Sequence, residues 1–124
     1  MIDPARLMPL RHRFMQAVRG WFSENGFIEV ETPIAVLSPG MEPHLDAFEL
    51  RSITRRPETD ATLYLHTSPE YHMKRILASY RAPIFQVCHC FRDEPPSRLH
   101  HHEFTMLEWY RPGADYTSLM DDWQ

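Results

Sequence analysis

The chain has 124 residues, of which 43% are hydrophobic, and a formal net charge of −4. This length suits one small domain with a packed core, and the composition argues against a chain that is disordered throughout. The mild negative charge disfavours binding of nucleic acid through bulk electrostatics, and no stretch approaches the roughly 18 apolar residues of a membrane span, so we expect a cytoplasmic protein without a membrane partner.

A helix followed by a strand is predicted near the start of the chain. Residues 10–24 carry apolar side chains at helical spacing, and Asn25-Gly26 is a typical signal for the end of a helix. Residues 27–32, FIEVET, then favour a strand that ends by Pro33. The apolar side chains predicted to share one face of the helix are Leu10, Phe14, Val18, Trp21 and Phe22.

The middle of the chain is predicted to be a connection with short strands and a second helix. Residues 37–60 are rich in turn-forming residues, with one strand near LDAFEL, and residues 62–67, TLYLHT, favour another strand. A helix over 69–80 follows. Its start is marked by Ser68 as N-cap, Pro69 at the first helical position and Glu70 in the first turn.

Two apolar segments rich in β-forming residues come next. Residues 84–94, IFQVCHCFRDE, and 102–110, HEFTMLEWY, are separated by a polar, proline-rich segment. This pattern predicts an antiparallel strand pair with a long hairpin loop. A last helix is predicted to begin near Asp115 and Tyr116. The elements together predict an α+β fold with an antiparallel sheet flanked by helices.

The alternation of side chains in the two strands predicts an unusual polar face. Successive residues of a strand point to opposite faces, so one side of the hairpin gathers an arginine, a glutamate, a tyrosine and a phenylalanine. Such a face suits a ligand that carries a phosphate, an amine and a flat ring. Its members are Gln86, Cys88, Cys90 and Arg92 from the first strand, and Phe104, Met106, Glu108 and Tyr110 from the second.

Each of these side chains has a chemical role and a plainer alternative. The guanidinium of Arg92 matches phosphate oxygens bidentately, but it could also form a surface ion pair with Glu94. Phe104 could stack on a base or simply pack in the core. Glu108 could pair with an ammonium group, and Tyr110 could either hydrogen-bond nearby or be an ordinary half-buried residue of the sheet.

A metal site is the main competing interpretation of the hairpin. Cys88, Cys90 and the histidines at 100–102 provide soft ligands. The Cys-x-Cys spacing is not that of a zinc knuckle, and adjacent histidines in a strand point to opposite faces. The sequence therefore favours free cysteines that behave as small hydrophobes, with no metal ligand within the chain.

Three segments resemble the class II aminoacyl-tRNA synthetases. The segment FRDE…HHHEFTMLEWY is similar to motif 2 of that family, which would span about residues 84–110. The segment GFIEVETP resembles the end of motif 1, which would span about residues 10–33. TSPEYHMKRIL resembles the amino-acid-binding segment of the lysyl branch. Within that branch, EFTMLEWYRPGADY is closer to the paralogues that modify elongation factor P than to the enzymes that charge lysine tRNA.

The resemblance implies an ATP-dependent ligase that activates lysine or (R)-β-lysine as an adenylate and transfers it to a lysine side chain of elongation factor P. Arg92 would be the catalytic residue, on the α-phosphate, and Phe104 would stack on adenine. The implied ATP-binding residues are Arg92, Asp93, Glu94, His101 and Phe104. The implied amino-acid pocket consists of Ser68, Pro69, Glu70, Glu108 and Tyr110.

The resemblance also implies what residues 1–124 do not hold. We expect no anticodon-binding domain and no motif 3, and the ligands of the Mg²⁺ that accompanies ATP are expected beyond residue 124. The chain would then be the N-terminal part of a catalytic domain, inactive alone, that forms a homodimer through motif 1, with Pro33 at the interface. The alternatives are a fragment of a lysyl-tRNA synthetase, with lysine tRNA as partner, and an inactive remnant or dimerising module.

Overall fold

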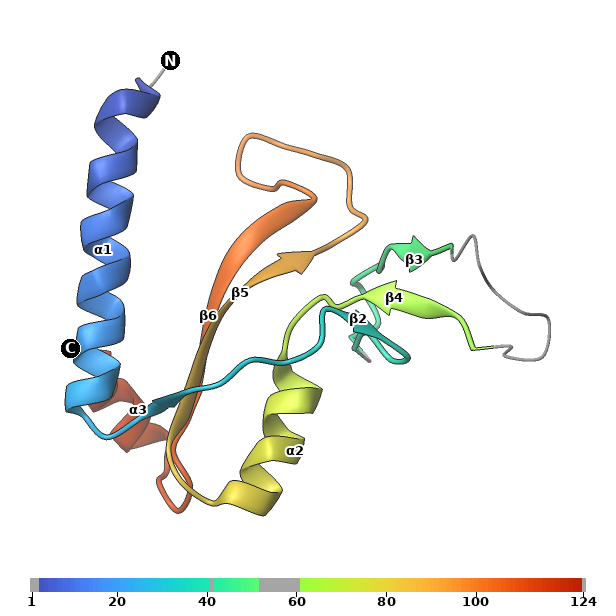
Figure 1. Cartoon of the computed structure of the whole chain (residues 1–124). Helices are drawn as coiled ribbons and strands as arrows, with labels where there is room; N and C mark the ends of the chain where they lie inside the picture. The colour runs from blue at the N-terminus through green and yellow to red at the C-terminus, as the bar shows by residue number, and fades with distance from the viewer. Residues whose placement is uncertain (1–2, 41, 52–60, 124) are drawn as a thin grey trace.

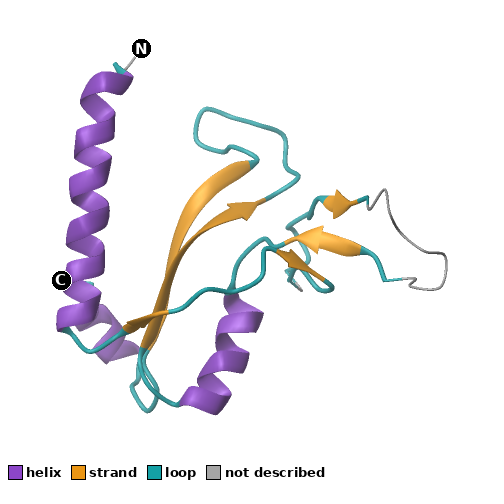
Figure 2. Ribbon diagram, viewed as in Figure 1, coloured by secondary structure: helices purple, strands orange, loops and turns teal. Residues whose placement is uncertain are grey.

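The computed structural model describes residues 3–40, 42–51 and 61–123 (Figure 1). These ranges contain helices, loops and two three-stranded sheets (Figure 2). The strand order is β1-β5-β6 in one sheet and β2-β4-β3 in the other. The elements are α1 (Pro4–Glu24), β1 (Ile28–Glu29), β2 (Ala35–Val36), β3 (Glu49–Leu50), β4 (Leu63–Leu65), α2 (Glu70–Tyr80), β5 (Ile84–Phe91), β6 (Glu103–Tyr110) and α3 (Tyr116–Asp122). The predicted mixture of helices and antiparallel strands is confirmed, except that β1 pairs with β5 in parallel.

The first helix begins at Pro4 rather than near residue 10. The carboxylate of Asp3 accepts a hydrogen bond from the backbone N–H of Ala5 at 3.0 Å, and Pro4 takes the first helical position, where its missing N–H costs nothing. The helix ends at Asn25 as predicted. Gly26 follows with a φ of 80°, a left-handed conformation that suits glycine because it has no Cβ.

Only part of the apolar stripe of α1 packs on the sheet. From this helix, Val18 and Phe22 join the core cluster. Leu10 and Phe14 are 54% and 66% exposed, and Trp21 is 37% exposed. The apolar face of this helix is therefore only partly buried, since Leu10 and Phe14 lie on a surface that the described part of the chain does not cover.

Aromatic side chains from α1, β5, β6 and the turn before β1 meet in the core. The ring of Phe22 stacks on that of Phe85 with centroids 4.5 Å apart and meets the ring of Phe27 edge-on at 5.0 Å. Trp109 approaches Phe22 at 5.7 Å. This cluster fixes α1 against one face of β5 and β6, and leaves the other face of the hairpin for the polar side chains. Val18, Val87 and Leu107 complete it.

The predicted hairpin is confirmed, with β5 and β6 paired from Ile84↔Tyr110 to Phe91↔Glu103. The register places Phe85 opposite Trp109 on the core face. On the other face, Gln86 lies opposite Glu108, Cys88 opposite Met106 and Cys90 opposite Phe104. The sorting of side chains by alternation is thus confirmed.

The short strands are shorter than the sequence predicts. The strand predicted over 27–32 is reduced to β1, because the chain leaves β5 after Val30, whose N–H still bonds the carbonyl of Phe85 at 2.8 Å. The strand predicted over 62–67 is reduced to β4, and the N–H groups of His66 and Thr67 bond the carbonyls of Ile34 and Pro39. The N–H of Phe91 bonds the carbonyl of His66 at 3.1 Å, which brings the end of β4 beside the hairpin.

The second helix begins one residue later than predicted. Pro69 is its N-cap rather than its first helical residue, and Ser68 acts from outside, its hydroxyl accepting a hydrogen bond from the N–H of Glu70 at 3.3 Å. Met73 is buried on the inner face of this helix. Arg81 ends the helix with a φ of 55°.

The last helix is held against the core by ionic and aromatic contacts. Asp115 caps α3, as its carboxylate accepts hydrogen bonds from the N–H groups of Thr117 and Ser118. Arg111 donates to Asp122 at 2.6 and 3.2 Å, and its guanidinium lies 4.5 Å from the ring centroid of Phe27. No helix in the described ranges is long and apolar enough to cross a membrane.

Candidate functional site

Arg92 and Phe104 come together at the loop end of the hairpin. Arg92 directly follows β5, and its N–H bonds the carbonyl of His102 at 2.9 Å, which continues the pairing with the other strand. Its guanidinium carbon lies 5.0 Å from the ring centroid of Phe104, within cation–π distance. The structure therefore brings together the arginine and the aromatic ring that the sequence assigns to a nucleotide.

The guanidinium of Arg92 has unused donor capacity. Its Nε is buried and has no hydrogen-bond partner in the described part of the chain, where no ion pair joins Arg92 to Glu94. A buried donor without an acceptor costs free energy, and an anion that accepts from Nε would remove this cost. The alternative of a surface ion pair with Glu94 is not what the structure shows.

Glu108 and Tyr110 form the second part of the polar face. The hydroxyl of Tyr110 donates to the Glu108 carboxylate. Burial raises the pKa of Glu108 above its usual value, the hydrogen bond from Tyr110 opposes this, and the charge of Glu70 adds to the rise. Burial, followed by the hydrogen bond to Glu108, raises the pKa of Tyr110. The charge of Glu70 on α2 thus acts on the carboxyl of Glu108 on β6.

The start of α2 supplies the remaining residues predicted for the amino-acid pocket. Glu70 receives a hydrogen bond from Lys74 at 2.5 Å, a pair of residues one helical turn apart. Ser68 is half-buried and Pro69 is fully buried. The excess negative charge of Glu70 and Glu108 over the single Lys74 makes this region suited to a ligand with an ammonium group.

The other predicted nucleotide-binding residues are less closely gathered. The N–H of Asp93 bonds the carbonyl of Asp46 at 2.9 Å, while the Asp93 side chain is exposed and Glu94 is half-buried. His101 is exposed in the loop between β5 and β6. The structure thus joins Arg92 to Phe104, and records no side-chain hydrogen bond from Asp93, Glu94 or His101 within the described ranges.

Sequence reasoning missed His66, which the fold places beside the two cysteines. His66 is 1% exposed, and its Nε2 lies 2.7 Å from the carbonyl O of His89 and 4.0 Å from Cys90 Sγ. Cys88 Sγ lies 3.8 Å from Cys90 Sγ. His66 follows β4, twenty-two positions before the first cysteine by its number in the sequence, so no spacing rule points to it.

The three groups shift one another's ionisation. The hydrogen bonds from Cys90 and His66 lower the pKa of Cys88 to about 5. The hydrogen bond to Cys88, and then burial, raise the pKa of Cys90. Burial acts to lower the pKa of His66, but its hydrogen bonds to Cys88 and to the carbonyl of His89 outweigh this and raise it. Cys88 is therefore the thiol that most readily loses its proton.

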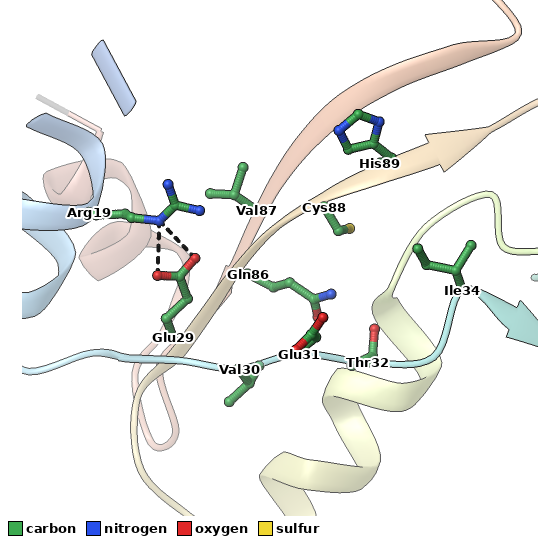
Figure 3. Close-up of a pocket in the computed structure, with 10 residues that line it drawn as sticks. All are labelled: Arg19, Glu29, Val30, Glu31, Thr32, Ile34, Gln86, Val87, Cys88 and His89. Carbon is green, nitrogen blue, oxygen red and sulfur yellow. Dashed lines mark hydrogen bonds and ion pairs between the residues drawn. The ribbon is translucent and has the colours of Figure 1, made fainter. Parts of the chain in front are cut away.

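A cavity of about 550 Å³ lies between the segment after β1 and strand β5 (Figure 3). Arg19 and Glu29 form an ion pair at 3.0 Å on its edge, and two buried side-chain oxygens that face no hydrogen-bond partner among the described residues belong to Thr32 and Gln86, which line it. None of the residues predicted to bind ATP or the amino acid lines this cavity. It is lined by Arg19, Glu29, Val30, Glu31, Thr32, Ile34, Gln86, Val87, Cys88 and His89.

A family sequence model and individual known proteins both match this chain, and the two comparisons agree. The sequence model of the family described as tRNA synthetases class II (D, K and N) matches residues 3–123. The chain is 44% identical over 112 residues to the elongation factor P–(R)-β-lysine ligase of Pasteurella multocida, covering 90% of this chain and 35% of that protein. The ligases of the same name from Salmonella arizonae and Mannheimia succiniciproducens are 46% and 42% identical, over 90% and 96% of this chain. The chain thus spans about a third of the length of these curated relatives.

Proposed function

Because the chain belongs to the family of class II tRNA synthetases (D, K and N), we propose that residues 1–124 form the part of an ATP-dependent ligase that binds nucleotide and amino acid. The observation that carries this proposal is the face of the β5–β6 hairpin. It presents Arg92 beside Phe104 at one end, and Glu108 bonded to Tyr110 toward the other. The pair of Arg92 and Phe104 would recognise a phosphate and a base, and the pair of Glu108 and Tyr110 would recognise an ammonium group.

On the nucleotide side, Arg92 binds the α-phosphate of ATP. Its unpartnered Nε and the planar fork of its donors suit phosphate oxygens. Phe104 stacks on the adenine ring, and Asp93, Glu94 and His101 complete the nucleotide contacts from the loop. The cation–π contact between Arg92 and Phe104 holds both groups on the same face before the nucleotide arrives.

On the amino-acid side, the carboxylates of Glu70 and Glu108 bind an amino group of lysine or (R)-β-lysine. Tyr110 positions the carboxylate of Glu108 through its hydrogen bond, and Ser68 and Pro69 shape the start of α2, from which Glu70 projects. An incoming ammonium group competes with Lys74 for Glu70. The names of the relatives in the previous section favour (R)-β-lysine.

The reaction begins when a carboxylate oxygen of the amino acid attacks the α-phosphorus of ATP, which releases pyrophosphate and gives an aminoacyl-adenylate. The ε-amine of a lysine of elongation factor P then attacks the acyl carbon, so that an amide forms and AMP leaves. Arg92 contributes by neutralising charge on the α-phosphate and by holding it in position. The cluster of metal-ligating groups found among the described residues is His66, Cys88 and Cys90, which does not fit the oxygen-preferring Mg²⁺. Beyond residue 124 is where we propose that the Mg²⁺ ligands lie.

The acceptor is tested by mass spectrometry of elongation factor P. The protein that contains this chain is incubated with ATP, (R)-β-lysine and elongation factor P, and the expected result is one added β-lysyl group on a lysine side chain. Addition to lysine tRNA without addition to elongation factor P would overturn the acceptor assigned here. Residues 1–124 alone are expected to bind nucleotide without amino-acid-dependent pyrophosphate exchange.

Binding of the amino acid is expected to depend on pH through Glu108. Its pKa is raised, so the carboxyl stays neutral to a higher pH than an ordinary glutamate, and the charged form that attracts an ammonium group appears only above the raised pKa. The affinity for (R)-β-lysine therefore rises with pH through that range. Calorimetric titration of the chain at a series of pH values measures it.

A matched variant gives the control for this pH dependence. Glu108→Gln keeps the shape of the side chain but cannot ionise, so its affinity for (R)-β-lysine should be weaker at high pH and nearly independent of pH. An unchanged pH profile in this variant would assign the dependence to a group other than Glu108.

We also propose that the exposed apolar side chains of α1 pack against a second copy of the chain. Leu10 and Phe14 are 54% and 66% exposed, and Pro33, in the segment after β1, is exposed too. Phe14→Asp should shift the chain from dimer to monomer in light scattering while its circular dichroism stays unchanged. The control is Arg13→Asp, which changes the charge at the exposed residue next to Phe14. If both variants shift the dimer to monomer equally, the shift comes from the change in charge and not from the loss of apolar packing.

A further inference from the structure

The side chains of His66, Cys88 and Cys90 form a cluster of soft metal-ligating groups on the polar face of the hairpin. Their ligand atoms all lie within 4.8 Å of one another. His66 and Cys90 are buried and Cys88 is half-buried. Two separate elements supply them, since His66 follows β4 whereas both cysteines lie on β5, where alternation places them on the same side.

The spacing of the two sulfur atoms matches a shared metal ion. With a metal–sulfur distance of about 2.3 Å and tetrahedral angles, two thiolates on one zinc ion lie roughly 3.8 Å apart. Cys88 Sγ and Cys90 Sγ are 3.8 Å apart. The strand therefore holds both sulfurs at the separation that ligation requires, although Cys-x-Cys is not the spacing of a zinc knuckle.

The ring of His66 brings a nitrogen next to the sulfur atoms. Its Nε2 lies 4.0 Å from Cys90 Sγ and donates to the carbonyl O of His89 at 2.7 Å. Nδ1 is buried and has no hydrogen-bond partner in the described ranges. A metal ion bound through Nε2 would replace the proton that Nε2 donates to His89.

A fourth soft atom lies next to the cluster. The thiol of Cys90 contacts the thioether Sδ of Met106 at 3.9 Å, and Met106 lies directly opposite Cys88 in the register of the hairpin. Thiolate, thioether and imidazole ligands select soft or borderline ions such as Cu(I) and Zn²⁺ over Mg²⁺ or Ca²⁺.

We propose that His66, Cys88 and Cys90 bind one soft metal ion with a filled d shell, Zn²⁺ or Cu(I), with Met106 as an additional ligand when the ion is Cu(I). The ion would tie the end of β4 to β5 and so brace the polar face on which Arg92 and Glu108 lie. This site involves none of the residues assigned to ATP or the amino acid, so the proposal stands apart from the ligase function.

The test is metal binding by the purified chain under a phosphine reductant. Zn²⁺ and Cu(I) are titrated separately against a chromophoric chelator, and Co²⁺ is used as a spectroscopic probe for Zn²⁺. One equivalent should bind, with a sulfur-to-cobalt charge-transfer band and the intense visible bands of tetrahedral cobalt. Cys88→Ser should weaken binding at least tenfold and halve the charge-transfer intensity for each bound Co²⁺.

Further variants separate this site from the loop and identify the ion. His66→Gln should also weaken metal binding at least tenfold. Because His66 is buried, circular dichroism checks that the His66→Gln variant folds. If that variant does not fold, the test rests on Cys88→Ser, since Cys88 is only half-buried. Replacing His100, His101 and His102 together by Gln should leave the affinity unchanged. Met106→Leu should weaken the binding of Cu(I) and leave the binding of Zn²⁺ unchanged.

Two results would overturn the proposal. One is the absence of a charge-transfer band when Co²⁺ is added, together with no binding of Cu(I). The other is binding of Zn²⁺ and Cu(I) that survives Cys88→Ser but is lost with the three loop histidines, which would assign the metal to the loop.

Discussion

Replacing Phe22 by alanine is expected to lower the free energy of unfolding of the chain by about 3–5 kcal/mol. The side chain is 5% exposed and touches Phe27, Phe85 and Trp109, so its loss leaves a cavity where α1 meets the hairpin. This is a large part of the roughly 5–15 kcal/mol that stabilises a small domain. Urea unfolding followed by circular dichroism measures it as a lower midpoint.

Phe14→Ala provides the matched control, because Phe14 lies on the same helix but is 66% exposed. Its effect on the free energy of unfolding should stay within about 0.5 kcal/mol when both variants are compared at a concentration where the chain is monomeric. Equal losses from the two replacements would mean that α1 is not held by the aromatic cluster described here.

Replacing Arg92 by alanine is expected to remove most of the affinity of the chain for ATP. Truncating one partner of a desolvated charge pair costs roughly 2–5 kcal/mol, which at about 1.4 kcal/mol for each factor of ten is a loss of about thirtyfold or more. The backbone bond of Arg92 to the carbonyl of His102 does not involve the side chain, so the hairpin should stay paired. Isothermal titration calorimetry with ATP gives the dissociation constants.

Two further variants make this result specific. Arg98→Ala removes an exposed arginine from the same loop and should leave the affinity nearly unchanged. Arg92→Lys keeps the charge but loses the planar fork, so its affinity should fall between those of the wild type and Arg92→Ala. A loss as large in Arg98→Ala as in Arg92→Ala would indicate general electrostatic attraction rather than a phosphate contact.

The sequence alone predicts those features that depend only on residues close to one another in the chain. Side chains alternate along any strand, so the face shared by Arg92, Phe104 and Glu108 could be predicted before their positions were known. The end of α1 at Asn25 and the cap of α3 at Asp115 also follow from residues next to one another in the chain. The earlier start of α1 has a local signal too, because Asp3 followed by Pro4 is a typical helix start that the apolar pattern alone does not include.

Contacts between residues far apart in the sequence could not be predicted in this way. His66 reaches the cysteines because the N–H of Phe91 bonds the His66 carbonyl at 3.1 Å, and because the end of β4 turns toward β5. No pattern in the sequence predicts which segment will lie beside that strand. The exposure of Leu10 and Phe14 has a similar origin, since an apolar stripe does not show whether the chain itself or a second copy covers it. The roles of Asp93, Glu94 and His101 stay predictions.

The central claim is that the polar face of the β5–β6 hairpin binds an adenylate together with its amino acid. A crystal structure of the chain with a non-hydrolysable analogue of (R)-β-lysyl-adenylate tests it most directly. The account predicts that the guanidinium of Arg92 contacts the phosphate, that the ring of Phe104 stacks on adenine, and that Glu108 contacts an ammonium group. An analogue bound instead in the cavity between Glu29 and Gln86, with no contact to Arg92, would contradict it.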